Sequence, residues 1–467
     1  MPTPAFSWTR RGFLKVGTAG VLGATAPRLM AGNAAVNQAV SGTAGWARAK
    51  SVLIVLLSGG PSQLDTLDPK PNAPLEIRGE FSSIGTATPG LQVCEHLPLL
   101  ASQSNRVAVV RTMSHTEHNH LLATHVALTG RPTPIPRGGS DLDRVQSRSD
   151  FPNYASALDY VRPRNDGVPT GVSLPNYLIE GPLTWPGQHA GFLGIKHDSW
   201  PINQDPNDPA FRIDSLALRE GLTRDRLLSR RGLLTDLDRS TPDSAKSRKS
   251  KSSEFGEQQE LAFSLLTSAK VTEAFDIHRE EAVTRERYGR NKFGQSLLLA
   301  RRLIDAGVPM VQAAMGIVQT WDTHVDNWGR LKKVLLPELD RGLNALLDDL
   351  QHSGRLDETL VIVMGEFGRT PRIGTLPGES VPGRDHWAHT YSAMFAGAGV
   401  LGGQVIGQSD EIAAYPVTRS WSPADLCTTV FNALGVDPNV EIIDPLSRPH
   451  RLQNGDVMAP LYTGVST

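Results

Sequence analysis

The chain has 467 residues, of which 39% are hydrophobic and 20% are charged. This is the composition of an ordinary globular protein with a sizeable core, and the length allows one large domain or two of common size. The formal net charge of −1 excludes a global field that would attract nucleic acid or an anionic membrane. Thirteen histidines stand against two cysteines. Metal chemistry is therefore expected to use imidazole and carboxylate, and Cys94 and Cys427 are interpreted as small buried hydrophobic residues, although they could pair.

The N-terminal segment resembles a twin-arginine export signal. Arg10 and Arg11 precede an apolar run that is too short and too rich in glycine for a stable membrane span. We assign residues 1–35 to this signal and 36–467 to the mature domain; the alternative is an ordinary amphipathic helix. No later segment approaches 18 consecutive apolar residues, so we expect no membrane span in the mature protein. The expected location is the periplasm or the extracellular space.

The first strand of the mature domain is expected at 51–57, where a continuous run of Val, Ile and Leu predicts burial on both faces. Two glycines and a proline end it, and Asp65 and Asp68 follow. A second buried strand is expected at 106–114. It leads into a histidine-rich turn and a helix in "HLLATHVALTGR".

The middle of the chain has weaker patterns. Residues 131–215 are rich in Pro and Gly, which indicates long ordered loops that cover the edge of the sheet. Residues 240–259 are dense in Ser and Lys and poor in apolar residues, so we expect a mobile linker within the domain.

Helices and strands alternate again in the second half of the chain. Helical patterns occur at 293–308, 331–351 and 422–436, and buried strands are expected at 309–315 and 358–369. Ser422 is the expected N-cap of the last of these helices, which should stop at Gly435. This alternation predicts a mostly parallel α/β sheet.

Acidic and histidine side chains recur just after the expected strands or, in one case, in a glycine-flanked loop. Because parallel strands place their carboxyl ends on one edge, such residues can converge although they are far apart in sequence. The groups are Asp65/Asp68, His115/His118/His120, Asp322/His324, Glu366 and His386/His389. Mixed Asp, Glu and His ligands suit a divalent metal; zinc is favoured by the imidazoles, with manganese, magnesium or calcium as alternatives.

Each group also has an ordinary structural explanation. Asp65 could form an Asx-turn, Asp322 could be a helix N-cap, and Glu366 could be a surface carboxylate at a strand end. His386 could be a core histidine bonded to a backbone carbonyl. Their shared placement on one edge is what favours a metal site.

Five motifs stand at these positions, in this order: "LSGGPSQLDTLDPKP", "HNHLLATHVALTGRP", "WDTHVDN", "GEFGRTPRI" and "GRDHWAHTYSAMFAGAGVLGG". From about residue 50 onwards the chain resembles the exported bacterial family called domain of unknown function 1501. That family is related to the alkaline phosphatase and sulfatase superfamily. The resemblance implies an α/β fold with a mostly parallel sheet flanked by helices, and long ordered loops over the carboxyl edge of the strands.

The resemblance also implies a metal site at that edge. Relatives carry Asp-His-Gly or Asp-Asn-Gly where this chain has Glu366-Phe367-Gly368, so Phe367 replaces one ligand. The implied metal ligands are Asp65, Asp322, His324, Glu366 and His386.

The nucleophile departs most from the superfamily pattern. His120 stands at the position of the modifiable Cys or Ser of sulfatases, so formylglycine chemistry is not expected. His120 could attack directly, bind the metal or act as an acid/base, and Thr116 and Ser114 are alternative hydroxyl nucleophiles. We assign His120 and Thr116 as catalytic candidates. The following helix N-terminus would favour an anionic group.

Arg369 and Arg384 flank the expected ligands. A guanidinium fork suits a tetrahedral oxyanion, so both are substrate-binding candidates; the alternative is a structural pairing with Asp or Glu. The expected function is an exported, metal-dependent hydrolase of phosphate or sulfate esters, acting on a small-molecule or glycan ester. The main alternative is a non-catalytic protein of the same fold that binds a glycan or an envelope partner, and a metal-dependent transferase is a third possibility.

Overall fold

The computed structural model describes residues 42–133, 145–213, 225–226, 229–230, 232–233, 268–317 and 320–464. The expected export signal at 1–35 and the expected linker at 240–259 lie outside the described residues. Among the described residues, no helix is long and apolar enough to cross a membrane.

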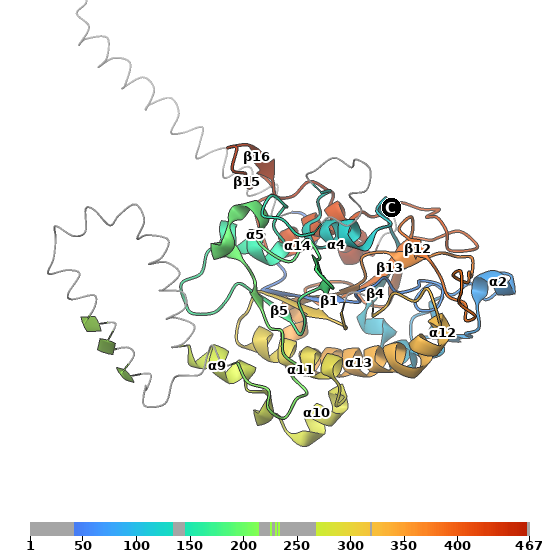
Figure 1. Cartoon of the computed structure of the whole chain (residues 1–467), viewed down its shortest axis with the longest axis horizontal. Coiled ribbons are helices and arrows are strands. Elements are labelled where there is room, and N and C mark those ends of the chain that lie inside the picture. Colours follow the sequence, from blue (N-terminus) through green and yellow to red (C-terminus); the bar gives the residue numbers. More distant parts are fainter. Residues whose placement is uncertain are drawn as a thin grey trace, which may run out of the picture.

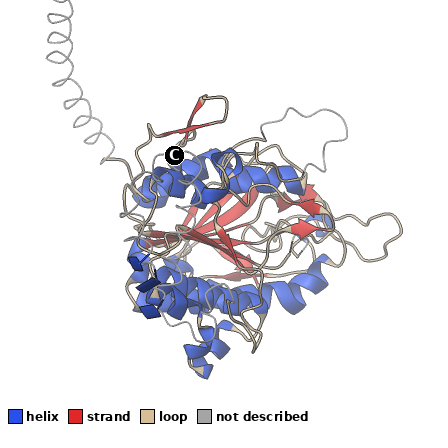
Figure 2. Ribbon diagram, turned by 60° about the vertical axis from the view of Figure 1, so that its left-hand side comes forward, coloured by secondary structure: helices blue, strands red, loops and turns tan. Residues whose placement is uncertain are grey.

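An eight-stranded sheet lies at the centre of the described chain (Figures 1 and 2). Its order is β14-β4-β13-β10-β1-β9-β5-β8. Paired neighbours run parallel, except that β13 is antiparallel to both β10 and β4. The predicted mostly parallel α/β sheet is therefore confirmed. The strands are β1 (Ser51–Leu56), β4 (Ala108–Met113), β5 (Gly171–Leu174), β8 (Trp200–Pro201), β9 (Met310–Ala314), β10 (Thr359–Met364), β13 (Tyr391–Ala396) and β14 (Gln404–Ile406).

Helices cover both faces of this sheet, as Figure 2 shows. On one face lie α9 (Ala269–Phe275), α10 (Ala282–Tyr288), α11 (Lys292–Asp305) and α13 (Leu336–His352). On the other lie α4 (His120–Thr129), α5 (Tyr154–Val161) and α14 (Pro423–Ala433). Strand β1 accounts for this arrangement, because Leu53 and Val55 pack into one core cluster and Ile54 and Leu56 into the other. A strand buried on both faces reads as the continuous apolar run found in the sequence.

Shorter elements complete the described fold. The helices are α2 (Leu75–Arg78), α3 (Pro98–Ser102), α12 (Asn327–Arg330) and α15 (Pro460–Thr463), with a π-helical turn, η7 (Leu331–Leu335), leading into α13. The two-stranded ribbons pair β2 (Ser83–Gly85) with β3 (Gln92–Cys94), β6 (Ile179–Glu180) with β7 (Leu183–Thr184), β11 (Gly368–Arg369) with β12 (His386–Trp387), and β15 (Glu441–Ile443) with β16 (Pro449–Arg451).

Local sequence patterns predicted some elements of the fold and missed others. Ser422 caps α14 in a reciprocal capping box with Asp425, as its sequence position predicts. The described part of residues 131–215 also contains α5, β5 and β8, which its Pro- and Gly-rich pattern did not indicate. Strand β5 has four residues, too few for a periodic pattern to stand out among prolines and glycines.

The segments that follow β1, β9 and β10 meet closely at one edge of the sheet. Gly59 has a φ of +112°, and a Cβ there would lie 2.5 Å from the backbone nitrogen of Asp322. Glycine is therefore required for both the turn and the close approach. The backbone N–H of Gly59 donates to both carboxylate oxygens of Glu366, at 2.9 and 3.1 Å. Contacts within the protein therefore hold these three segments together at this edge.

A buried ion pair also fixes this edge of the sheet. The side chains of Asp65 and Arg384 are fully buried, and Arg384 Nε lies 2.7 Å from Asp65 Oδ2. Asp65 also accepts hydrogen bonds from Ser62 Oγ at 2.6 Å and from Asn327 Nδ2 and Trp328 Nε1 at 3.0 Å each. The pair therefore ties the segment after β1 to the start of α12 and to the loop before β12.

Removing the cation from this pair should destabilise the whole fold. In Arg384→Ala the Asp65 carboxylate stays buried without its counter-charge, which typically costs about 3–5 kcal/mol of unfolding free energy. Equilibrium denaturation measures it. The control is Arg279→Ala, because Arg279 and Glu273 form an exposed pair at 3.4 Å with side chains 55% and 63% exposed. Such a pair contributes at most about 1 kcal/mol. Equal losses in the two variants would contradict this account.

Candidate metal centre

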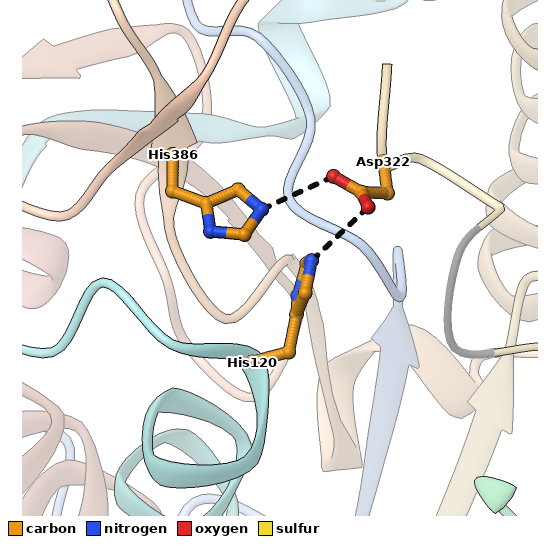
Figure 3. A group of neighbouring side chains, drawn as sticks. All are labelled: His120, Asp322 and His386. Carbon is orange, nitrogen blue, oxygen red and sulfur yellow. Dashed lines mark hydrogen bonds and ion pairs between the residues drawn. The ribbon is translucent and has the colours of Figure 1, made fainter. Parts of the chain in front are cut away.

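Three side chains from distant parts of the chain meet at this edge (Figure 3). His120 is the first residue of α4, Asp322 follows β9, and His386 lies in β12. Each offers one ligand atom, and these atoms all lie within 4.8 Å of one another. Figure 3 shows the two imidazoles next to each other, with one oxygen of the Asp322 carboxylate directed toward each ring.

The contacts within the group converge on Asp322. His120 Nε2 lies 3.4 Å from Oδ2, and His386 Nε2 lies 3.2 Å from Oδ1. His324 joins from the outer side, with its Nε2 3.0 Å from Asp322 Oδ1 and 2.9 Å from His386 Nε2. Three imidazoles therefore direct the same ring nitrogen, Nε2, toward one carboxylate.

The opposite ring nitrogen of each histidine has a partner. Nδ1 of His386 lies 2.7 Å from the backbone oxygen of His118. A carbonyl oxygen only accepts, so this Nδ1 carries the hydrogen and neutral His386 has its lone pair on Nε2. Nδ1 of His120 lies 2.7 Å from Glu366 Oε1, and Nδ1 of His324 lies 2.8 Å from Asp385 Oδ1.

The electrostatics of the group favour a cation. Burial would raise the pKa of Asp322, but its contacts with three histidines and with the Arg369 guanidinium hold that pKa below its usual range. Burial would lower the pKa of His120, but the carboxylates of Asp322 and Glu366 raise it to about 9. Burial lowers the pKa of His386, opposed by its bond to Asp322. The carboxylates therefore attract positive charge onto His120.

These residues fit a divalent metal. His120 Nε2 is buried and makes no hydrogen bond to any described residue. The three distances to Asp322 and the distance between His324 Nε2 and His386 Nε2 run from 2.9 to 3.4 Å, and the ligand atoms of His120, Asp322 and His386 all lie within 4.8 Å of one another. Two ligand atoms that each stand about 2.0–2.1 Å from a tetrahedral zinc ion are roughly 3.3 Å apart. Three imidazoles and one carboxylate are also a donor set that zinc accepts.

Other predicted site residues have different surroundings. Asp65 is engaged in the structural pair with Arg384, and both are outside the group of three. Arg369 is fully buried: its Nε donates to the Gly60 oxygen at 2.8 Å, and its Nη2 contacts Asp322 Oδ1 and the Gly59 oxygen. Both guanidinium groups are buried and paired with aspartates of the protein, Arg369 with Asp322 and Arg384 with Asp65. The two arginines therefore have a structural role beside the site.

Two catalytic expectations depend on the start of α4. Thr116 is exposed, in the loop between β4 and α4. The N-terminus of α4 is already capped, since the Asn119 side chain accepts from the N–H groups of Leu121 and Leu122. Those N–H groups are satisfied within the protein, so the expected anion site there is not supported.

The ordinary explanation of Asp322 as a helix cap is wrong. Helix α12 begins at Asn327, and its N-cap is Asp326. The sequence did not single out Trp185, which stacks on the His120 ring at 5.0 Å, or Asp385, which holds His324. Asp385 lies beside His386 in a quoted motif, so adjacency to a ligand was the available signal.

Phe367, the residue after Glu366, packs against two of the candidate ligands. Its ring is fully buried and lies 4.9 Å from the His120 ring and 4.6 Å from the His386 ring, measured between centroids. Together with Trp185 it covers the His120 ring with apolar surface. An apolar wall strengthens charge interactions inside the site by lowering the local dielectric.

Solved structures with detectable similarity are distant in sequence. They include Ps i-CgsB (11% identity, 89% of this chain and 77% of that one, TM-score 0.42). Others are the PsFucS1 sulfatase from Pseudoalteromonas sp. (13%, 83% and 68%, TM-score 0.37) and a protein in the alkaline phosphatase superfamily from Vibrio parahaemolyticus (13%, 84% and 68%, TM-score 0.35). No curated protein matches the sequence significantly.

The match to a sequence family is much more extensive. It covers residues 49–461, and with them each of the five motifs in which the candidate ligands occur. The family resemblance inferred from those motifs is therefore confirmed. The chain belongs to the family described as "Protein of unknown function (DUF1501)".

Proposed function

We propose that this protein is an exported, metal-dependent hydrolase of phosphate or sulfate esters. The observation that carries the proposal is the convergence of three imidazole Nε2 atoms on the mostly buried carboxylate of Asp322. The proposed ligands are His120, Asp322, His324 and His386. Zinc is the favoured metal because imidazole dominates this set, with manganese, magnesium or calcium as alternatives.

A bound divalent cation at this position polarises an ester oxygen and lowers the pKa of water, to about 7 in favourable cases. The chain's own residues prepare the site for that chemistry. Arg369 holds Asp322 through its Oδ1 and has no exposed surface of its own. Trp185 and Phe367 keep water away from the His120 ring.

The same geometry favours water as the attacking group. Nδ1 of His120 is hydrogen-bonded to Glu366 and its Nε2 faces Asp322 at 3.4 Å, so the ring fits a ligand better than a free nucleophile. Thr116 is exposed in its loop.

A binding protein is the second candidate, and one observation favours it. Phe367 fills the place where relatives carry a second ligand, and its ring packs against two of the proposed ligands. Such a site could hold a single structural cation and recognise a glycan or an envelope partner without turnover. Substrate assays on the metal-loaded protein distinguish the two candidates.

The first test is metal content. Asp322→Ala removes the carboxylate that all three histidines contact, so bound zinc per folded chain should fall at least about tenfold. Elemental analysis of the purified protein measures this. Asp326→Ala is the matched control. Asp326 lies in the same loop as Asp322, where it is the N-cap of α12, and it is outside the group of three. Full metal occupancy in Asp322→Ala would reject the centre.

The second test is turnover. The zinc-loaded protein should hydrolyse at least one of three probes: an aryl phosphate, an aryl phosphodiester or an aryl sulfate. Chelation should abolish the rate and added zinc should restore it, and His386→Ala should lower the rate by roughly a hundredfold or more. Undiminished metal binding without hydrolysis of any probe would instead favour the binding protein.

The third test concerns export. The Arg10-Arg11 pair before an apolar run supports twin-arginine transport of the folded chain. Replacing both residues by Lys should leave the precursor in the cytoplasm, as cell fractionation followed by immunoblotting would detect. Unchanged export of that variant would exclude the route.

A further inference from the structure

Glu366 is a carboxylate inside the site that does not face the other ligands. Its side chain is 1% exposed, and both oxygens accept the N–H of Gly59, at 2.9 and 3.1 Å. Oε1 also lies 2.7 Å from His120 Nδ1. Within the described chain, the side-chain hydrogen bonds of Glu366 go to the N–H of Gly59 and to His120 Nδ1. Its contacts are thus directed to the back of His120.

This geometry defines what Glu366 does to the imidazole. A carboxylate accepts hydrogen bonds, so His120 Nδ1 carries the hydrogen and, in the neutral ring, Nε2 carries the lone pair. Because Gly59 anchors both oxygens, the ring has little freedom to turn. A carboxylate behind a metal-binding imidazole fixes the tautomer and raises the basicity of the ligating nitrogen.

Asp385 repeats the arrangement on the outer side of the site. Its Oδ1 lies 2.8 Å from His324 Nδ1, and its side chain is 61% exposed. Thr370 fixes the backbone of Asp385 through two hydrogen bonds. The Asp385 N–H donates to the Thr370 hydroxyl at 3.0 Å, and the Thr370 N–H donates to the backbone oxygen of Asp385 at 2.9 Å. Solvent competes with the exposed carboxylate, so it holds its histidine less firmly than Glu366 does.

We infer that Glu366 and Asp385 are positioning residues that act through His120 and His324, and that neither is a metal ligand. The centre is then a three-histidine, one-carboxylate site in which each imidazole binds through Nε2. This rests on the metal-binding part of the proposed function and is independent of whether the protein hydrolyses esters. It replaces the sequence-based assignment of Glu366 as a ligand.

The test compares isosteric variants in zinc and cobalt binding. Glu366→Gln keeps an oxygen that can accept from His120 Nδ1 but loses the negative charge. We expect one bound equivalent, an unchanged visible spectrum of the Co²⁺ form, and zinc affinity lowered about 10–100-fold in competition with a chelator. Asp385→Asn should keep the same spectrum with a smaller loss of affinity, about tenfold or less.

Asp322→Ala provides the contrast of a removed ligand. It should change the Co²⁺ spectrum as well as the affinity, whereas Asp326→Asn should change neither. The inference is overturned if Glu366→Gln alters the Co²⁺ spectrum in the way that Asp322→Ala does. It is also overturned if Glu366→Gln leaves zinc affinity untouched. Wild-type protein that binds no cation would overturn both this inference and the proposed function, whereas failure to hydrolyse the ester probes would leave this inference standing.

Discussion

The site depends on keeping one carboxylate ionised in a place that water barely reaches. The Asp322 side chain is 14% exposed and touches three imidazoles and the buried guanidinium of Arg369. A buried carboxylate is stable only when positive charge or hydrogen-bond donors surround it. His120 comes from the start of α4, Arg369 from β11 and His386 from β12, so these three segments are held to the loop after β9 by this single acceptor.

Asp65 and Asp322 show how the same residue type acquires two roles at one edge. Asp65 is surrounded by a guanidinium, a hydroxyl, an amide and an indole, none of which changes protonation near neutral pH. The imidazoles around Asp322 can lose a proton and accept a cation instead. The first carboxylate is therefore suited to a permanent structural contact and the second to an exchangeable one.

The sequence predicted the sheet better than the side-chain assignments. Continuous apolar runs located β1, β4 and β10, and the position of Asp322 and His386 near one edge brought them together correctly. Position after a strand does not reveal which way a side chain points, so Asp65 and the two arginines were given site roles although they are buried in structural contacts. Burial and hydrogen-bond partners are properties of the assembled loops, and no local pattern encodes them.

The charge balance explains why a cation suits this arrangement. With neutral imidazoles, the carboxylates of Asp322, Glu366 and Asp385 and the guanidinium of Arg369 leave two negative charges, which is the charge that one divalent ion neutralises. The carboxylates raise the pKa of His120 to about 9, so a proton on this ring neutralises part of the same negative charge. Zinc and that proton would compete for Nε2, because Nδ1 is held by Glu366. Phe367 and Trp185 lower the local dielectric beside the ring. Both cations are then attracted more strongly to the carboxylates, because charge interactions increase as the dielectric falls.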